Sequence, residues 1–407
     1  NNKFEKASWD EVYKIIKSKI NNTNKDKICG IVGDLTNMET SFIFKEFFNR
    51  TIETNKYESR QSQSFIDTSS RENYLFNSTI NGIEEADCIL ILGSNVREEA
   101  PIINTRIRKQ LLIRDIPIGL IGDNYDLTFD YEHLGNDLNI LKSISDGESD
   151  FCKKLDEAKK PMIIIGQSLL NREDSLNSFS LIENIIHQYA FINSGWNGVN
   201  TLQLSASRVG ALDMGCYQTS RSLKDIYADA ESGSLKILFS FGADEIDFTK
   251  FKNTKIIYMG SHGDRGASHA DIILPSAAYT EKDGIYINTE GRLQYAYQAS
   301  FPPNEAKTDW KILNQLSEML NLNWGFVSLD EVRNKIKNEY PHLFDQVSSE
   351  RPYQRLLANK ASKISFDKKE IDTMIKDFYL TDTISRLSKT MAECSQIRKE
   401  LRNGKSL

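Results

Sequence analysis

"CILILGSN" (88–95) is the stretch that decides the fold. Its continuous apolar run, Cys88 to Leu92, is followed by Gly93 and two small polar residues. Such a run is typical of a strand that is covered on both faces, as in a parallel sheet. Glycine at its end permits a tight turn. The same pattern recurs in "ICGIVGD" (28–34), "IPIGLIGDN" (116–124), "PMIIIGQS" (161–168), "ILFSFGAD" (237–244) and "IIYMGSHGD" (256–264).

Helical patterns lie between these runs. Ser8 and Glu11 are spaced as a capping box at the start of 8–20. The stretches 100–113 and 199–215 also repeat apolar residues at helical spacing. Alternation of strand and helix indicates βαβ units, and so an α/β fold of doubly wound parallel sheets. The expected apolar face of 199–215 comprises Val199, Leu202, Ala206, Val209 and Leu212.

The spacing of the apolar runs predicts two lobes. Three runs precede residue 125 and three follow residue 160, with the polar, turn-rich "SISDGESD" (143–150) near the seam. We therefore expect a first α/β lobe at 1–150, a second at 151–300 and a helical C-terminal region at 301–407. Its tail should carry Ile384, Leu387 and Met391 on one side.

Composition limits the classes of function. The 407 residues carry a net charge of −6, which gives no broad basic surface and argues against nucleic acid as a partner. No apolar run approaches the roughly 18 residues of a membrane span. The first residue is Asn1, so a cleaved leader or an upstream segment is a possibility. The five cysteines are scattered without any C-x-x-C, which predicts buried free thiols in a reducing compartment and no zinc or iron–sulfur site.

Two loops after apolar runs are candidate anion sites. They are Gly93–Asn95 and Gly260–Gly266, where backbone N–H groups would bind the ligand, although most glycines after strands simply turn the chain. His262, Asp264 and His269 suggest either a metal or acid–base cluster or an ordinary hydrogen-bonded pair.

The stretch 281–292 predicts a hairpin. Asp283–Gly284 and Glu290–Gly291 are turn dipeptides, so both glycines are expected at positive φ. Arg292 could pair with Glu290 or with a phosphate. No nucleophile, triad or paired-acid arrangement accompanies them. The residues alone therefore indicate a two-lobed α/β protein with nucleotide-like loops and no identifiable reaction.

Four stretches carry a resemblance to known proteins. "ADIILPSAAYTEKDGIYINTEGRLQ" (270–294) is similar to a signature of the molybdopterin oxidoreductase superfamily, and "LGSNVREEAP" (92–101) resembles its loop that faces the pterin dinucleotide. A closer resemblance is to the family of the largest peripheral-arm subunit of respiratory complex I, the 75 kDa iron–sulfur subunit of mitochondria. It covers nearly the whole chain, in the stretches 78–109, 197–215, 260–294 and 375–394.

The resemblance implies that this chain corresponds to a portion of such a subunit that carries out no cofactor chemistry. The cysteine-bound iron–sulfur clusters of the family belong to an N-terminal part, and are expected in a missing portion or in a partner chain. No residue matches the metal ligand of active molybdopterin enzymes, so neither a catalytic residue nor a metal site is expected. The residues of the vestigial cofactor cleft are expected to be Gly93, Asn95, His262, Gly263, Asp264, Glu281, Asn288, Glu290 and Arg292.

The function implied by the resemblance is structural. The chain would support NADH-to-ubiquinone electron transfer as a docking domain of the peripheral arm, in contact with other arm subunits and with the iron–sulfur portion. Its location would be the matrix side of the mitochondrial inner membrane, or the cytoplasmic face of a bacterial inner membrane. Two alternatives remain at this point: an active molybdopterin-dependent oxidoreductase fragment, and a free-standing nucleotide-binding α/β protein.

Overall fold

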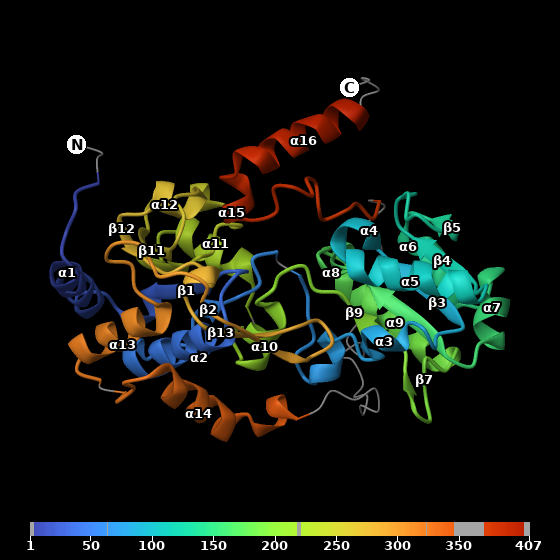
Figure 1. Ribbon diagram of the computed structural model, residues 1–407, viewed down its shortest axis with the longest axis horizontal. Coiled ribbons are helices and arrows are strands. Elements are labelled where there is room, and N and C mark those ends of the chain that lie inside the picture. The colour runs from blue at the N-terminus through green and yellow to red at the C-terminus, as the bar shows by residue number, and fades with distance from the viewer. Residues whose placement is uncertain (1–3, 63, 218–220, 323, 346–369, 403–407) are drawn as a thin grey trace.

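Two five-stranded parallel sheets form the two lobes of the computed structural model, which describes residues 4–62, 64–217, 221–322, 324–345 and 370–402 (Figure 1). The strand order of the first sheet is β12-β11-β10-β1-β2, and that of the second is β5-β4-β3-β6-β9. The first comprises β1 (Ile28–Val32), β2 (Tyr57–Glu58), β10 (Ile237–Phe241), β11 (Lys255–Gly260) and β12 (Ile272–Pro275). The second comprises β3 (Cys88–Leu92), β4 (Ile118–Ile121), β5 (Glu132–Gly135), β6 (Pro161–Ile165) and β9 (Val199–Thr201).

Both sheets are doubly wound, which confirms the expected fold class. In the first sheet the strand order reverses between β1 and β10, and in the second between β3 and β6. All six apolar runs of the sequence contain a strand of these sheets. Because strands β1, β3, β6 and β10 are buried along their whole length, their sequences are continuously apolar rather than alternating.

The predicted boundary at residue 150 does not separate the sheets. Ile28 lies beside Ile237 in the first sheet, and Cys88 lies beside Pro161 in the second. The chain builds two strands of the first lobe, then the whole second sheet, and only then the remaining strands of the first lobe (Figure 1). The division into 1–150 and 151–300 was wrong because strand pairing over such a distance leaves no local trace in the sequence.

Helices cover both sheets. In the first lobe they are α1 (Trp9–Asn21), α2 (Met38–Glu46), α10 (Arg208–Asp213), α11 (Leu223–Glu231), α12 (Arg265–His269), α13 (Asp309–Met319) and α14 (Leu329–Glu339). In the second they are α3 (Thr79–Gly82), α4 (Val96–Glu99), α5 (Pro101–Ile113), α6 (Leu138–Ser145), α7 (Phe151–Glu157), α8 (Gln167–Leu170) and α9 (Ser175–Gln188). Near the C-terminus follow α15 (Thr383–Arg386) and α16 (Lys389–Arg402).

Several helix predictions need correction. The capping box of Ser8 and Glu11 forms as predicted at the start of α1. The stretch 199–215, expected as one helix, divides into β9 and the short α10. The region 301–407 is no separate unit, because α13 and α14 pack on α2 in the first lobe. Its residues 346–369 lie outside the described residues.

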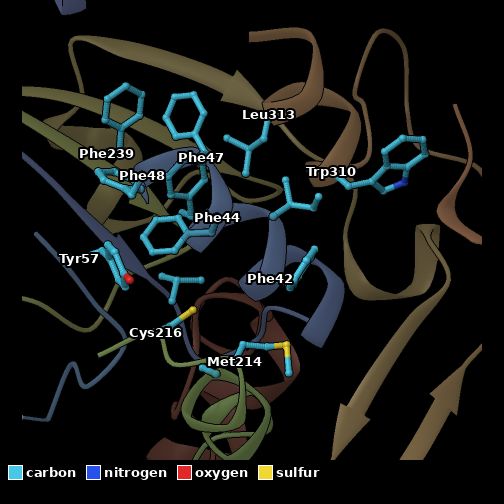
Figure 2. Packing of buried hydrophobic residues seen from close by; sticks show 14 of the residues in the cluster. Phe42, Phe44, Phe47, Phe48, Tyr57, Met214, Cys216, Phe239, Trp310 and Leu313 are labelled. Carbon is cyan, nitrogen blue, oxygen red and sulfur yellow. The ribbon is translucent and has the colours of Figure 1, made fainter. Parts of the chain in front are cut away.

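An aromatic cluster forms the core of the first lobe. Phe47 and Phe48 meet Phe239 edge-on at ring-centroid distances of 5.7 and 5.9 Å, and Phe44 lies 5.0 Å from Phe241 (Figure 2). Gly30 in β1 makes room for it, since a Cβ there would lie 2.3 Å from the Phe48 ring. Rings from one helical segment thus dock directly on two neighbouring strands of the sheet.

A hairpin joins the lobes. Its strands are β13 (Gly284–Ile287) and β14 (Leu293–Ala296), paired antiparallel. At its turn, the Phe76 amide donates to the Thr289 carbonyl at 2.8 Å, and the Ile80 amide donates to Glu290 Oε2 at 2.8 Å. Phe76 and Ile80 contribute to the hydrophobic cluster of the second lobe, so this turn fixes the position of one lobe on the other.

Candidate functional site

The best candidate for a ligand-binding site lies over the carboxyl ends of the strands in the two sheets. In doubly wound sheets, ligands bind outside the carboxyl ends of the strands, where the strand order reverses. Here that place is covered by residues 370–388, which we call the C-terminal segment. Figure 1 shows it in red, running from the second lobe, near α4, to α15 beside the first lobe.

On the first lobe, the C-terminal segment is held by one arginine. Arg386 donates to Glu245 at 2.7 and 3.1 Å and to Asp264 at 2.7 and 2.9 Å. Its side chain is 13% exposed. Glu245 and Asp264 follow the carboxyl ends of β10 and β11. Burial raises the pKa of Glu245, and the guanidinium beside it opposes that shift. The predicted site residue Asp264 is therefore already paired with a cation, Arg386, of the same chain.

The cleft on the first lobe is almost filled. Thr383 and Ile384 of the C-terminal segment line a remaining cavity of about 60 Å³, together with Gly242 and Asp244 at the end of β10. Small-molecule sites usually enclose ~300–1,000 Å³, so this space is far too small for a cofactor. Asp244 is itself committed to structure, because it accepts from Tyr258 at 2.8 Å and from the Gly266 amide at 2.7 Å.

On the second lobe, the C-terminal segment sits on the predicted loop after β3. Gly93 adopts φ +58°, and a Cβ there would lie 3.1 Å from Ile371. The Ile371 amide donates to the Asn136 carbonyl at 3.2 Å. Asn95 is 7% exposed, and its Oδ1 has no hydrogen-bond partner among the described residues. The helix that follows, α4, is a single turn, so the loop lacks the long helix that an anion site would use.

Other predicted site residues lie outside this cleft. His262 and Glu281 line a groove of about 1120 Å³ along β12. His262 Nδ1 lies 2.9 Å from Ser261 Oγ, while His269 stacks on Phe248 at 5.4 Å. A Cβ added at Gly263 would have nothing within 4 Å. Together with the pairing of Asp264 to Arg386, this leaves no His262–Asp264–His269 cluster. In the described part of the chain, no group of three or more His, Cys, Asp or Glu could hold a metal ion.

The signature residues at the hairpin turn contact protein groups. Asn288 Oδ1 accepts from the Arg292 amide at 2.8 Å, and Glu290 Oε1 accepts from Arg292 Nε at 2.9 Å. Gly291 has φ +82°, as predicted. Gly284 does not have a positive φ, so that part of the prediction was wrong. Its small size is needed instead because a Cβ would lie 2.6 Å from the Asn37 amide nitrogen.

Sequence reasoning missed the residues that close the cleft. Arg386, Glu245, Ile371 and Glu99 were not among the predicted site residues. Asp264 and Glu245 lie 122 and 141 positions from Arg386, so no local spacing links them. The one available signal was the stretch 375–394, which contains Arg386 and which carried part of the family resemblance.

The comparisons with known proteins agree with this architecture. Residues 1–319 match the family model of molybdopterin oxidoreductase. The chain belongs to the molybdopterin oxidoreductase family. Residues 349–394 match a second family, the C-terminal part of the G subunit of NADH-ubiquinone oxidoreductase. This second match includes the whole of the C-terminal segment, residues 370–388.

Curated relatives of this molybdopterin oxidoreductase family member match it along its full length. The chain is 38% identical over 98% of its length to the G subunit of NADH-quinone oxidoreductase from Rickettsia bellii, and 36% identical over 98% to the NADH-ubiquinone oxidoreductase 75 kDa subunit of Reclinomonas americana. It spans 57% and 59% of those proteins. A solved formyltransferase/hydrolase complex (FhcABCD) of Methylorubrum extorquens contains a chain with TM-score 0.59 and 12% identity, over 78% of this chain and 98% of that one. That likeness concerns the fold alone.

The pterin cofactor that the family name implies does not fit the closed cleft. Ile371 lies against Gly93, Thr383 and Ile384 leave about 60 Å³ on the first lobe, and Arg386 pairs with the acidic groups beside it. Each of these places would have to be vacated before a dinucleotide could lie across the strand ends. No helix in the described ranges is long and apolar enough to cross a bilayer.

Proposed function

We propose that the chain is a non-catalytic structural portion of respiratory complex I, within the peripheral arm that carries electrons from NADH to quinone. The observation that supports this most directly is the 36–39% identity to subunits of NADH-quinone and NADH-ubiquinone oxidoreductase along 98–99% of the chain. The filled strand ends of the first lobe support a structural role, because Thr383 and Ile384 leave only about 60 Å³ there.

A rigid scaffold suits electron transfer. Electron tunnelling requires fixed distances between clusters, and a large α/β body can hold a neighbouring iron–sulfur portion in place. The hairpin turn at Thr289–Glu290 is among the contacts that hold the two lobes together as one body. The partners on this proposal are the iron–sulfur portion of the same subunit and other arm subunits. Iron–sulfur clusters would lie in that portion, not in these residues.

The proposed location follows the relatives. The complex would place this chain on the matrix side of the mitochondrial inner membrane, or on the cytoplasmic face of a bacterial one. The relatives come from Rickettsia and from Reclinomonas, so both settings are represented. The chain would be attached to the membrane through other subunits.

Purification of the native complex tests this function. A tagged chain, isolated in mild detergent, should bring down the other subunits of NADH-quinone oxidoreductase together with NADH-oxidising activity. The separated chain should contain no stoichiometric molybdenum, tungsten or pterin. Stoichiometric metal with pterin would instead make it an active oxidoreductase. A monomer that binds nucleotide and co-purifies with no such subunit would favour the free-standing nucleotide-binding protein.

A further inference from the structure

The C-terminal segment is held by ion pairs at its first-lobe end and by hydrogen bonds that involve its own backbone at its second-lobe end. There the Ile371 amide donates to the Asn136 carbonyl at 3.2 Å, and Arg172 donates to the Glu370 carbonyl at 3.3 Å. At the first lobe, Arg386 makes four charge-assisted hydrogen bonds to Glu245 and Asp264. Asp382 begins α15 there, accepting from the Ile384 amide at 2.9 Å and from the Ser385 amide at 3.0 Å. This end therefore combines a partly buried ion-pair network with a capped helical turn.

Buried polar atoms without partners in the described part of the chain lie near both ends of the segment, as Thr383 Oγ1 at the first lobe and as a larger group at the second lobe. Asn95 Oδ1, Ser168 Oγ and Glu99 Oε1 are buried without a hydrogen-bond partner among the described residues. The Met374 amide lies close enough to the Glu99 carboxyl to lower its pKa. Even so, Glu99 Oε1 makes no hydrogen bond of normal geometry. Buried polar groups left unpaired oppose the closed arrangement, because water would satisfy them once the segment lifted.

We propose that residues 370–388 form a latch over the cleft, which stays fixed at Arg386 and opens at Ile371–Met374. Opening at that end uncovers Gly93 in the loop that follows β3 and the nearby Glu99 carboxyl, while the strand ends of the first lobe remain covered. The latch goes beyond the structural role proposed above, since a scaffold would work equally well with the segment immobile at both ends.

Protonation of Glu99 controls the releasable end. Ser94 donates to Glu99 Oε2 at 2.6 Å. Burial raises the Glu99 pKa to about 7. The charged and titratable groups around it come from three elements. Glu98 on α4 pairs with Arg398, and Asp372 on the segment pairs with Lys376. Tyr125 and Asp123 lie after β4. Most of these groups are acidic or, as with Tyr125, uncharged, so they do not favour ionisation of Glu99.

The sign of the pH effect follows from this shift. The closed latch keeps Glu99 protonated up to about pH 7, whereas an opened, hydrated glutamate has its ordinary pKa of 4.5. The closed form thus binds more protons between these values, so its stability is greatest at low pH and falls as pH rises toward 7 and through it. Between pH 6 and pH 8 the closing equilibrium should weaken about tenfold.

Hydrogen exchange on the full chain tests the latch. Amide protection factors, corrected for the intrinsic pH dependence of exchange, are measured at pH 6 and pH 8. Protection of residues 371–374 should fall about tenfold across this range, while protection of residues 384–388 should not change. Equal protection of residues 371–374 at both pH values would overturn the proposal, as would an equal loss at both ends of the segment.

Three variants separate the two ends. Glu99→Gln, which cannot ionise, should remove the pH dependence of residues 371–374. Glu84→Gln is the matched control, because Glu84 belongs to the same lobe but pairs with Arg106 and Lys109 at the surface, and it should behave as wild type. Arg386→Ala should lower protection of residues 384–388 at both pH values. If Glu99→Gln fails to fold, the wild-type comparison still decides. An unchanged pH dependence in a folded Glu99→Gln chain contradicts the role of this carboxyl.

Discussion

At the residue scale, the turn of the hairpin shows how one position can be fixed by two independent demands. Gly291 has φ +82°, which side chains rarely adopt, and a Cβ there would lie 2.9 Å from Leu75 and 3.1 Å from Arg71. Arg71 in turn donates to the Gly291 carbonyl and to Asp213. Backbone conformation and close contact with neighbouring side chains therefore both exclude a larger residue at this turn.

Gly291→Ala should destabilise the protein more than an alanine placed at an open glycine. The positive φ alone costs about 1–2 kcal/mol, and the contacts with Leu75 and Arg71 add about 1–3 kcal/mol of overpacking. Gly195→Ala is the matched control, because Gly195 has φ +74° with nothing within 4 Å of its added Cβ. Melting temperatures of the two variants should rank Gly291→Ala well below Gly195→Ala. Equal melting temperatures would show that the contacts with Leu75 and Arg71 add nothing.

At the element scale, strands could be predicted and their partners could not. The run Cys88–Leu92 is apolar because β3 is buried on both faces. A buried strand of this kind can therefore be recognised from its sequence alone. Pairing of β1 with β10 leaves no such signal, since each would suit many neighbours. For the same reason Asp264 could be singled out as a polar residue after a strand, whereas its partner Arg386 could not.

The aromatic helix α2 is where we expect a single truncation to cost most. Phe44 is fully buried and touches Phe48, Tyr57 and Phe241. Phe44→Ala should lower the free energy of unfolding by roughly 3–5 kcal/mol, because it leaves a cavity between helix and sheet. Phe301→Ala, at a ring that is 86% exposed, should change it by less than about 0.5 kcal/mol. Urea titrations followed by circular dichroism would compare them, and a loss below about 1 kcal/mol for Phe44→Ala would contradict the packing described.

At the scale of the whole molecule, the second lobe is inserted into the first. Its five strands all lie between β2 and β10 along the chain, and its own hydrophobic clusters cover both faces of its sheet. The first lobe, in contrast, needs residues from both sides of the insertion. The helices α13 and α14 belong to it as well, through their contacts with α2.

This nesting predicts which pieces can fold alone. A fragment of residues 75–203 contains the complete second sheet and should show a cooperative thermal transition by circular dichroism. A fragment of residues 151–300 contains strands of both sheets but completes neither, and it should not. A cooperative transition in the 151–300 fragment together with none in the 75–203 fragment would contradict the observed strand pairing.

The pairing of β1 with β10 also has a consequence for synthesis on the ribosome. The pairing of Ile28 with Ile237 cannot form until Ile237 has been translated, roughly two hundred residues later. At ordinary elongation rates this takes about 10–40 s. During that interval the phenylalanines of α2 have no sheet to dock on, while the second lobe can already be complete. The nascent chain therefore passes through a stage with one finished lobe and one exposed aromatic surface, which is the stage at which we expect chaperones to bind it.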